Sequence, residues 1–270
     1  MSATAKAKDS PYNVQVLDRA AAILETLSES GEEQTLLDLS ERLGLHKSTV
    51  HRLLMVLERH RYVEKNPASG RYALGLKLFE LGQKAVSRLG LEERAHPHLE
   101  KLAHEVGETA HLCVLDEGEV LYLAKVEATR TVRVPSTVGR RNPAHCTAVG
   151  KALLAHCPGE EVERIVREHG LRSFTKHTIV TAGELARELA AIRERGYAVD
   201  DEEIEEGLTC IGAPVRDSSG RVVASISIAG PTFRIPKRKI ATLASRVVVA
   251  ANELSAELGH RPLRSARAGR

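Results

Sequence analysis

Residues 36–63 constrain the fold of this chain more than any other segment, because they contain two amphipathic helical patterns separated by a very short turn. The first pattern, 36–43, follows Thr35, which can cap a helix, and precedes Gly44, which can adopt the left-handed conformation that ends one. The second pattern begins at His46 or Lys47. Two helices so close in sequence are expected to fold back on each other.

The second helical pattern separates apolar from polar side chains. At about 100° per residue, one side of the helix carries the apolar positions Val50, Leu53, Leu54 and Leu57. The opposite side and its flank carry Ser48, His51, Arg52 and Arg59. The apolar side is therefore predicted to pack on the neighbouring helices, and the question is what the polar side faces.

The segments on either side complete a recognisable arrangement. From Val14, "VQVLDRAAAILETLSES" has helical periodicity and stops at Gly31. After the second pattern, "YVEKNPASGRYAL" contains two short β-prone runs joined by an Asn-Pro-Ala-Ser-Gly turn, which is typical of a hairpin. Three helices followed by a hairpin predict a winged helix-turn-helix over residues 13–75.

Charge is concentrated where such a domain would meet DNA. Residues 42–71 contain seven Lys or Arg and two Glu, whereas residues 1–41 contain three cations and eight anions. The net charge of the whole chain, +3, conceals this separation. A solvated helix face could also carry such charges, but the short turn, the hairpin and the separated charge together favour a DNA-binding surface.

We therefore predict that the polar side of the third helix enters the DNA major groove. Lys47, Ser48 and Thr49 are suited to phosphates or base edges, and His51 and Arg52 can reach base acceptors. The remaining DNA-contact candidates are Thr35, Arg59, Arg61, Lys65 and Arg71, of which the last three are expected to hold the backbone near the wing.

The composition is that of a globular protein with two domains. The chain has 270 residues, of which 42% are hydrophobic and 28% charged, and its longest apolar runs are far shorter than the roughly 20 residues of a membrane span. The N-terminus lacks the apolar stretch of a signal peptide, so we expect a cytoplasmic protein without membrane contact. The spacing of its four cysteines matches no zinc pattern or disulfide framework, and we expect reduced thiols and no cofactor.

The second half alternates strand-like and helix-like patterns. An apolar helical stripe starts at Ala73, and we assign 76–90 to a linker helix that packs either on a partner subunit or on its own domains. The stretches "TAHLCVLDEGEVLYLAKVE" and "TCIGAPVRD" with "RVVASISIAG" predict hairpins, "TVRVPS" predicts a further strand, and helices intervene. Strands mostly in hairpin order indicate an antiparallel α+β sandwich over 91–259. Residues 1–12 are assigned to a disordered tail and 260–270 to a basic tail.

A possible ligand site lies in "HCTAVGK", where a loop with Gly139, Asn142 and Pro143 leads into a helix. The amides of Ala148 and Val149 at the helix start could stabilise a carboxylate. An ordinary capped helix, with Thr147 satisfying these amides, explains the same residues, and the sequence leaves both interpretations open.

These features together resemble the IclR family of bacterial transcriptional regulators, over about residues 14–258. The resemblance rests on "RAAAILETL", "LSERLGLHKSTVHRLLMVLERHRYVEKN", "GRYALGLKLFELG", "HCTAVGKALLA" and "EEGLTCIGAPVRDSSGRVVASISIAGP". It implies a winged-helix head, a linker helix, a C-terminal GAF-like α/β effector-binding domain with an antiparallel sheet, and a homodimer or tetramer. His46 stands where the family often has proline, so the start of the third helix is expected to be less rigid.

The resemblance also implies an effector pocket. Its expected residues are Val134, Ala148, Val149, Asp200, Leu208, Cys210 and Ser227. Ala229 stands where some members have a second serine, so the ligand should be less polar or differently placed than the small keto acids of some relatives. The implied function is a repressor that binds a near-palindromic operator and responds to a small carboxylate or aromatic metabolite.

The sequence also offers residues for other functions. A metal-responsive regulator would use His111, Cys113, His145, Cys146 and Cys210, but their spacings are irregular. An enzyme would need Cys210 or Cys146 as nucleophile with His145 or His177 as base, and nothing in the sequence fixes their geometry, so we expect no catalysis. A DNA-architectural protein leaves the second domain unexplained, and an activator of a catabolic operon would use the same head.

Overall fold

The computed structural model describes residues 14–87, 90–127, 130 and 136–261. It separates into two compact units, Met1–Arg88 and Leu89–Arg270. Almost all of the predicted terminal tails lies outside the described residues. Among the described residues, no helix is long and apolar enough to cross a membrane.

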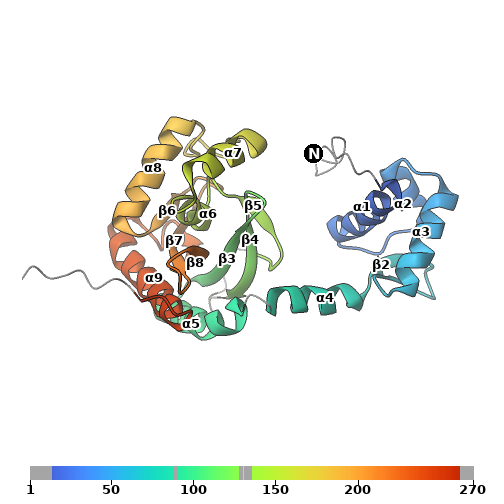
Figure 1. Ribbon diagram of the computed structural model, residues 1–270, viewed down its shortest axis with the longest axis horizontal. Helices are drawn as coiled ribbons and strands as arrows, with labels where there is room; N and C mark the ends of the chain where they lie inside the picture. The colour runs from blue at the N-terminus through green and yellow to red at the C-terminus, as the bar shows by residue number, and fades with distance from the viewer. Residues whose placement is uncertain (1–13, 88–89, 128–129, 131–135, 262–270) are drawn as a thin grey trace, which may run out of the picture. The chain divides into compact units, whose positions relative to one another are not determined.

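The N-terminal unit has the predicted winged helix-turn-helix arrangement (Figure 1). Its elements are α1 (Gln15–Ser30), α2 (Leu36–Leu43), α3 (Lys47–Arg59), β1 (Val63–Lys65), β2 (Tyr72–Leu74) and α4 (Leu76–Ser87). Strands β1 and β2 pair antiparallel as the wing. The core contains Ile23, Leu27, Leu39, Val50, Leu54, Leu57, Val63 and Tyr72. The apolar side of α3 is thus buried, as its periodicity predicts.

Local capping explains where the helices begin and end. Thr35 and Asp38 form a capping box, in which Thr35 Oγ1 accepts from the Asp38 amide at 3.1 Å and Asp38 Oδ2 accepts from the Thr35 amide at 2.9 Å. Gly44 ends α2 in the left-handed conformation. At the start of α3, the ring of His46 takes over the capping role, since its Nδ1 accepts from the Ser48 amide at 3.4 Å.

Helix α4 begins at Leu76, the first residue of the predicted linker helix, although the apolar helical spacing extends back to Ala73. The helical spacing predicted from Ala73 includes Leu74, but both residues belong to β2, and Gly75 separates the strand from the helix. A side chain at Gly75 would collide with the backbone of Arg61, so the chain needs glycine at this point. Leu76 and Phe79 on α4 are each 65% exposed.

The C-terminal unit is built on an antiparallel sheet with helices on both faces. Its elements are α5 (Leu91–Val106), β3 (Thr109–Asp116), β4 (Glu119–Val126), β5 (Arg141–Pro143), α6 (Ala148–Leu154), α7 (Gly159–His169), α8 (Ala182–Arg195), β6 (Ala198–Asp201), β7 (Leu208–Arg216), β8 (Val222–Pro231) and α9 (Lys237–Glu257). In the described residues the sheet has six strands in the order β5-β4-β3-β8-β7-β6. This is the predicted α+β class.

The two faces of the sheet have different partners (Figure 1). Helix α6 crosses one face and lies so close to β7 that a side chain at Gly212 would meet the backbone of Ala148 at 2.9 Å. Helices α5 and α9 pack on β3 and β4 and on β7 and β8, respectively. Ser255 on α9 accepts from the Arg216 amide at 2.9 Å. The helix α6 thus lies against the middle of the sheet.

Two strands were not predicted from the sequence. Asn142 and Pro143, which we assigned to a loop, belong to the short strand β5, which pairs with β4. Strand β6 pairs with β7. The further strand predicted in "TVRVPS" falls almost entirely on 131–135, outside the described residues.

Candidate DNA-binding surface and ligand cavity

The outer face of α3, comprising Lys47, Ser48, His51, Arg52 and Arg59, is exposed. These residues occupy the side opposite the buried Val50, Leu54 and Leu57. A helix with a buried apolar side and a free polar side can enter a DNA major groove without unfolding. The polar residues of α3 are therefore accessible to DNA, as the predicted contacts require.

Two predicted DNA contacts lie less openly. Thr49 is half-buried beside the exposed Ser48. The Thr35 hydroxyl donates to Asp38 Oδ2 at 2.7 Å within the capping box, so its proton is already used in the protein. To donate to a DNA phosphate, the Thr35 hydroxyl would have to give up its hydrogen bond to Asp38. The Thr35 contact stays a prediction.

The wing carries the other cations and is fixed to the body of the unit by Glu33. Glu33 accepts from Asn66 Nδ2 at 2.8 Å and from Ser69 Oγ at 3.0 Å, and these contacts lower the pKa of Glu33. Arg61, Lys65 and Arg71 are exposed. Lys65 lies over the ring of Tyr72, 5.4 Å from its centroid, and Arg71 donates to the Glu33 carbonyl oxygen at 3.2 Å. The wing is thus a positioned basic loop.

The C-terminal unit contains a cavity of about 210 Å³ between the start of α6 and the sheet, here called the α6 cavity. Six of the seven residues expected for the ligand pocket line it, namely Ala148, Val149, Asp200, Leu208, Cys210 and Ser227. Val134 lies outside the described residues. Segments far apart in sequence meet here because β6, β7 and β8 are neighbours in the sheet.

The start of α6 provides backbone donors to the α6 cavity. The Thr147 hydroxyl accepts from the Gly150 amide at 3.2 Å, but among the described residues no acceptor is bonded to the amides of Ala148 and Val149. The cap expected from Thr147 therefore exists and satisfies a different amide. Both Ala148 and Val149 have small or compact side chains, so a ligand oxygen could approach their amides.

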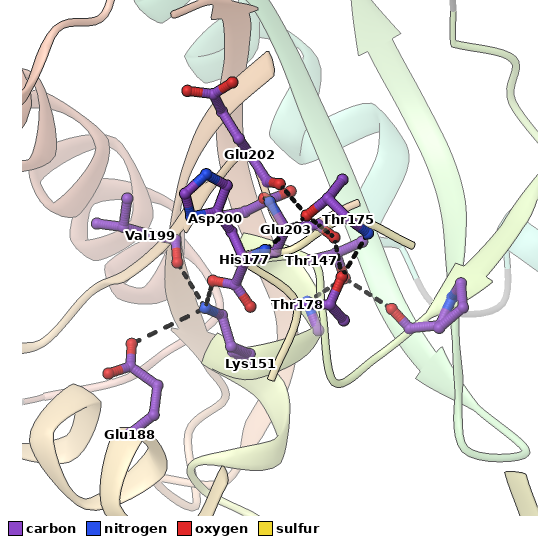
Figure 2. A network of polar contacts seen from close by, with 12 residues as sticks. Thr147, Lys151, Thr175, His177, Thr178, Glu188, Val199, Asp200, Glu202 and Glu203 are labelled. Carbon is purple, nitrogen blue, oxygen red and sulfur yellow. Dashed lines mark hydrogen bonds and ion pairs between the residues drawn. The ribbon is translucent and has the colours of Figure 1, made fainter. Parts of the chain in front are cut away.

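Asp200 is the charged side chain buried most deeply in the α6 cavity. Its exposure is 0%, its Oδ1 accepts from the Glu203 amide at 2.8 Å, and its Oδ2 has no partner among the described residues. Burial raises the pKa of Asp200 to about 7, assisted by the Glu203 carboxylate and opposed by the backbone amides of Glu203 and Ile204 and by Lys151. Figure 2 shows Asp200 beside Glu203 and Lys151.

Several cavity residues were not predicted as part of the pocket. They are His111, Tyr122, Ser136, Thr137, Arg140, Asn142, Pro143, Thr147, Phe174, Ile204 and Glu205, whereas Ala229, expected in the pocket in place of a serine, also lines the cavity. His111 Nε2 and Ser136 Oγ are 2.8 Å apart, and burial followed by the charge of Lys125 lowers the pKa of His111 to about 4. His111 faces the same side of the sheet as Ser227, its partner in register, so the alternation of β3 could have placed it here.

The cysteines and histidines do not assemble into a reactive centre. Burial raises the pKa of the Cys113, Cys146 and Cys210 thiols, which disfavours a thiolate nucleophile. In the described part of the chain, no three His, Cys, Asp or Glu side chains are grouped as metal ligands. His145 is bonded instead to the Arg172 carbonyl oxygen at 3.1 Å.

Comparison with known proteins decides the family. The model of the bacterial transcriptional regulator IclR C-terminal domain matches residues 83–256, and the IclR helix-turn-helix domain matches residues 16–67. The chain belongs to the IclR family of transcriptional regulators. The DNA-binding head and the α6 cavity therefore belong to an IclR-family regulator, and its relatives are named as regulators or repressors rather than enzymes.

Relatives match over nearly the whole chain. The HTH-type transcriptional regulator XynR of Escherichia coli is 36% identical over 92% of this chain and 98% of its own length. The transcriptional repressor IclR of E. coli is 34% identical over 91% of this chain and 90% of its own. A crystal structure of an IclR homologue from Microbacterium hydrocarbonoxydans, complexed with 4-hydroxybenzoate, has a TM-score of 0.81, 29% identity, and covers 90% of this chain and 99% of its own.

Proposed function

We propose that this IclR-family regulator is a repressor whose operator affinity changes when a small carboxylate or aromatic acid enters the α6 cavity. The observation that carries the proposal is the convergence on this cavity of six residues from α6, β6, β7 and β8. The predicted domain division into a head (13–75), a linker helix (76–90) and an effector domain (91–259) is part of the proposal.

The chemistry of the α6 cavity supports an anionic ligand. Backbone amides at Ala148 and Val149 can donate to a carboxylate, and Arg140 lies at the exposed rim. The wall formed by Leu208, Tyr122 and Phe174 is apolar or aromatic. Since about 210 Å³ is below the roughly 300–1,000 Å³ of drug-sized pockets, the ligand should be a small molecule.

The arrangement of the head supports operator binding by the outer face of α3 and the wing. A homodimer or tetramer would place two heads in successive major grooves of a near-palindromic operator, with half-sites about 34 Å apart. The exposed cations would supply most of the affinity. The logarithm of the binding constant should therefore fall linearly with the logarithm of the salt concentration, with a slope of about 0.9 per phosphate contacted. The repressor named among the relatives supports repression over activation.

Control by the ligand requires that the ligand bind one arrangement of the heads better than another. A ligand with equal affinity for both arrangements would leave operator binding unchanged. The linker helix α4 (Leu76–Ser87) directly follows the wing in sequence, which supports it as the element through which the two units influence each other.

The proposal is tested by two linked measurements. An operator is first selected from random duplex DNA by the purified full-length protein and confirmed by gel shift. Small carboxylates and aromatic acids are then screened by thermal shift, and each hit is added to the gel shift. We expect selection of a near-palindromic sequence and a hit that changes its affinity. Absence of sequence preference, or hits that never alter DNA binding, would reject the proposal.

A further inference from the structure

We propose that Asp200 binds the anionic group of the effector as a carboxylic acid, donating a hydrogen bond from the carboxyl oxygen that lacks a protein partner, so that ligand binding is accompanied by proton uptake. This inference rests on the proposed function, because it concerns the same α6 cavity. It adds a chemical reason why a buried acidic residue can lie in a pocket for anions.

The side chain of Asp200 has incomplete hydrogen bonding. Oδ1 accepts from the Glu203 amide at 2.8 Å, whereas Oδ2 has no partner among the described residues and the side chain is fully buried. An ionised carboxylate offers about four acceptor sites, and burying one that is so poorly bonded is costly. Protonation of Oδ2 removes the charge and turns the unpartnered atom of this cavity-lining residue into a hydrogen-bond donor.

Lys151 neutralises Asp200 only in part, because Lys151 is paired with Glu203. Lys151 is 1% exposed, and its ammonium group donates to the Val199 carbonyl oxygen at 2.6 Å and forms an ion pair with the Glu203 carboxylate. Figure 2 shows both contacts, with Glu188 3.9 Å away on the other side. The buried carboxyl groups of Asp200 and Glu203 thus have one buried ammonium group between them, and that ammonium group forms its ion pair with Glu203. A negative charge on Asp200 would be only partly compensated by Lys151, which is already paired with Glu203.

The other ionisable groups around the cavity do not supply the missing charge. Cys210 pairs with Asp200 in register, Cys113 and His111 come from β3, Tyr122 comes from β4, and Cys146 precedes α6. Burial keeps the thiols and the phenol protonated by raising their pKa, and it keeps His111 neutral by lowering its pKa. The lining also includes one exposed cation, Arg140, and one exposed anion, Glu205, whose charges are opposite in sign.

The proton balance follows from this geometry. Ionised Asp200 takes one proton from solvent, forming an O–H bond at Oδ2, and that proton is donated to an oxygen of the ligand anion without being transferred. At a pH where Asp200 is ionised, the free protein must gain this proton on binding. Affinity for an anion should then fall about tenfold per pH unit above the midpoint of Asp200. This loss of affinity is expected above neutral pH, because burial raises the pKa of Asp200 to about 7.

The ionisation of Asp200 can be measured without any ligand. Full-length protein with ¹³C-labelled aspartate carboxyls is titrated by NMR, alongside Asp200→Asn and the matched control Asp201→Asn. Asp201 is the neighbouring residue, and it pairs with Lys237 at 3.2 Å. We expect one carboxyl with a midpoint near 7 that is missing only from Asp200→Asn. Titration of every aspartate below about pH 5 would overturn the proposal.

Calorimetry with 4-hydroxybenzoate and benzoate as probes then measures proton uptake. At pH 8, titrations in buffers of different ionisation enthalpy should show about one proton taken up per ligand bound. Asp200→Asn carries a permanent N–H donor, so its affinity should be independent of pH between 6 and 8, while that of the wild type falls about tenfold. Equal pH dependence in both proteins would overturn the proposal. Failure of every probe to bind would count against the effector class, and the NMR titration would still decide the state of Asp200.

Discussion

Gly150 packs so closely against Ala144 that a side chain at position 150 would overlap the Ala144 backbone, including its carbonyl oxygen. This contact holds the first turn of α6 against the preceding loop, and so it fixes Ala148 and Val149, which line the α6 cavity. The close packing of α6 on the preceding loop therefore requires glycine at this position.

Gly150→Ala should destabilise the protein by about 1–3 kcal/mol, because backbone atoms must shift to admit the methyl group. It should also weaken the ligand-induced thermal shift, since the amides of Ala148 and Val149 move. Gly159→Ala on α7 is the control, because open space surrounds that position. Chemical denaturation compares the two variants. If Gly150→Ala and Gly159→Ala had the same free energy of unfolding, the predicted overlap at position 150 would be contradicted.

Arg52→Ala should weaken operator binding by about 1–3 kcal/mol and relax sequence preference at one base pair, because an exposed arginine on α3 can bond a base edge in two places. Arg187→Ala, on an exposed part of α8, is the matched loss of one positive charge and should leave binding unchanged. Gel shifts with single-base operator variants measure both effects. An unaltered shift for Arg52→Ala would reject this contact.

Glu33→Ala should weaken operator binding several-fold with a small change in melting temperature, because the wing turn loses its bonds from Asn66 and Ser69. Glu32→Ala removes the same charge next to it, where the side chain is exposed. If the two variants bind operator equally well, the position of the wing does not depend on Glu33.

Ser227→Ala and Asp200→Ala should abolish the response to ligand and spare operator binding in its absence, since both side chains line the α6 cavity. Ser225→Ala is the control for Ser227, because Ser225 is two residues away on the same strand and donates to the Ala213 carbonyl oxygen at 3.0 Å. Ser225→Ala should lower stability and retain the response. A normal response in both cavity variants would place the ligand elsewhere.

His111→Gln should reduce the loss of stability in acid. The pKa of His111 is lowered from 6.5 to about 4 in the folded protein, so the unfolded chain binds more protons between these values. The stability that depends on neutral His111 is fully present above pH 6.5 and is lost as the pH falls toward 4, by up to about 3 kcal/mol. Denaturation of both proteins from pH 7 to 4.5 measures the difference. The variant should still lose some stability as the pH falls, because the pKa of His156 is also lowered to about 4. Parallel pH profiles for the two proteins would contradict a neutral, buried His111.

The head was predictable from sequence because its signals are local. The stripe of Val50, Leu54 and Leu57 determines which side of α3 is buried, and Thr35 and Gly44 set the limits of α2. Strand β6 escaped prediction because four residues ending in Asp200 and Asp201 do not resemble a strand, and only pairing with β7 makes them one.

The amino-acid sequence alone determined the helices, the wing and the separation of charge, since periodicity and capping act between residues a few positions apart. Tertiary structure alone decided that Asp200 lies opposite Cys210 and His111 opposite Ser227, and that Lys151 pairs with Glu203 rather than with Asp200. Such relationships arise from strand pairing and helix packing between distant segments. The protonation of a buried carboxyl group depends on which neighbours it meets there, and no local pattern encodes them.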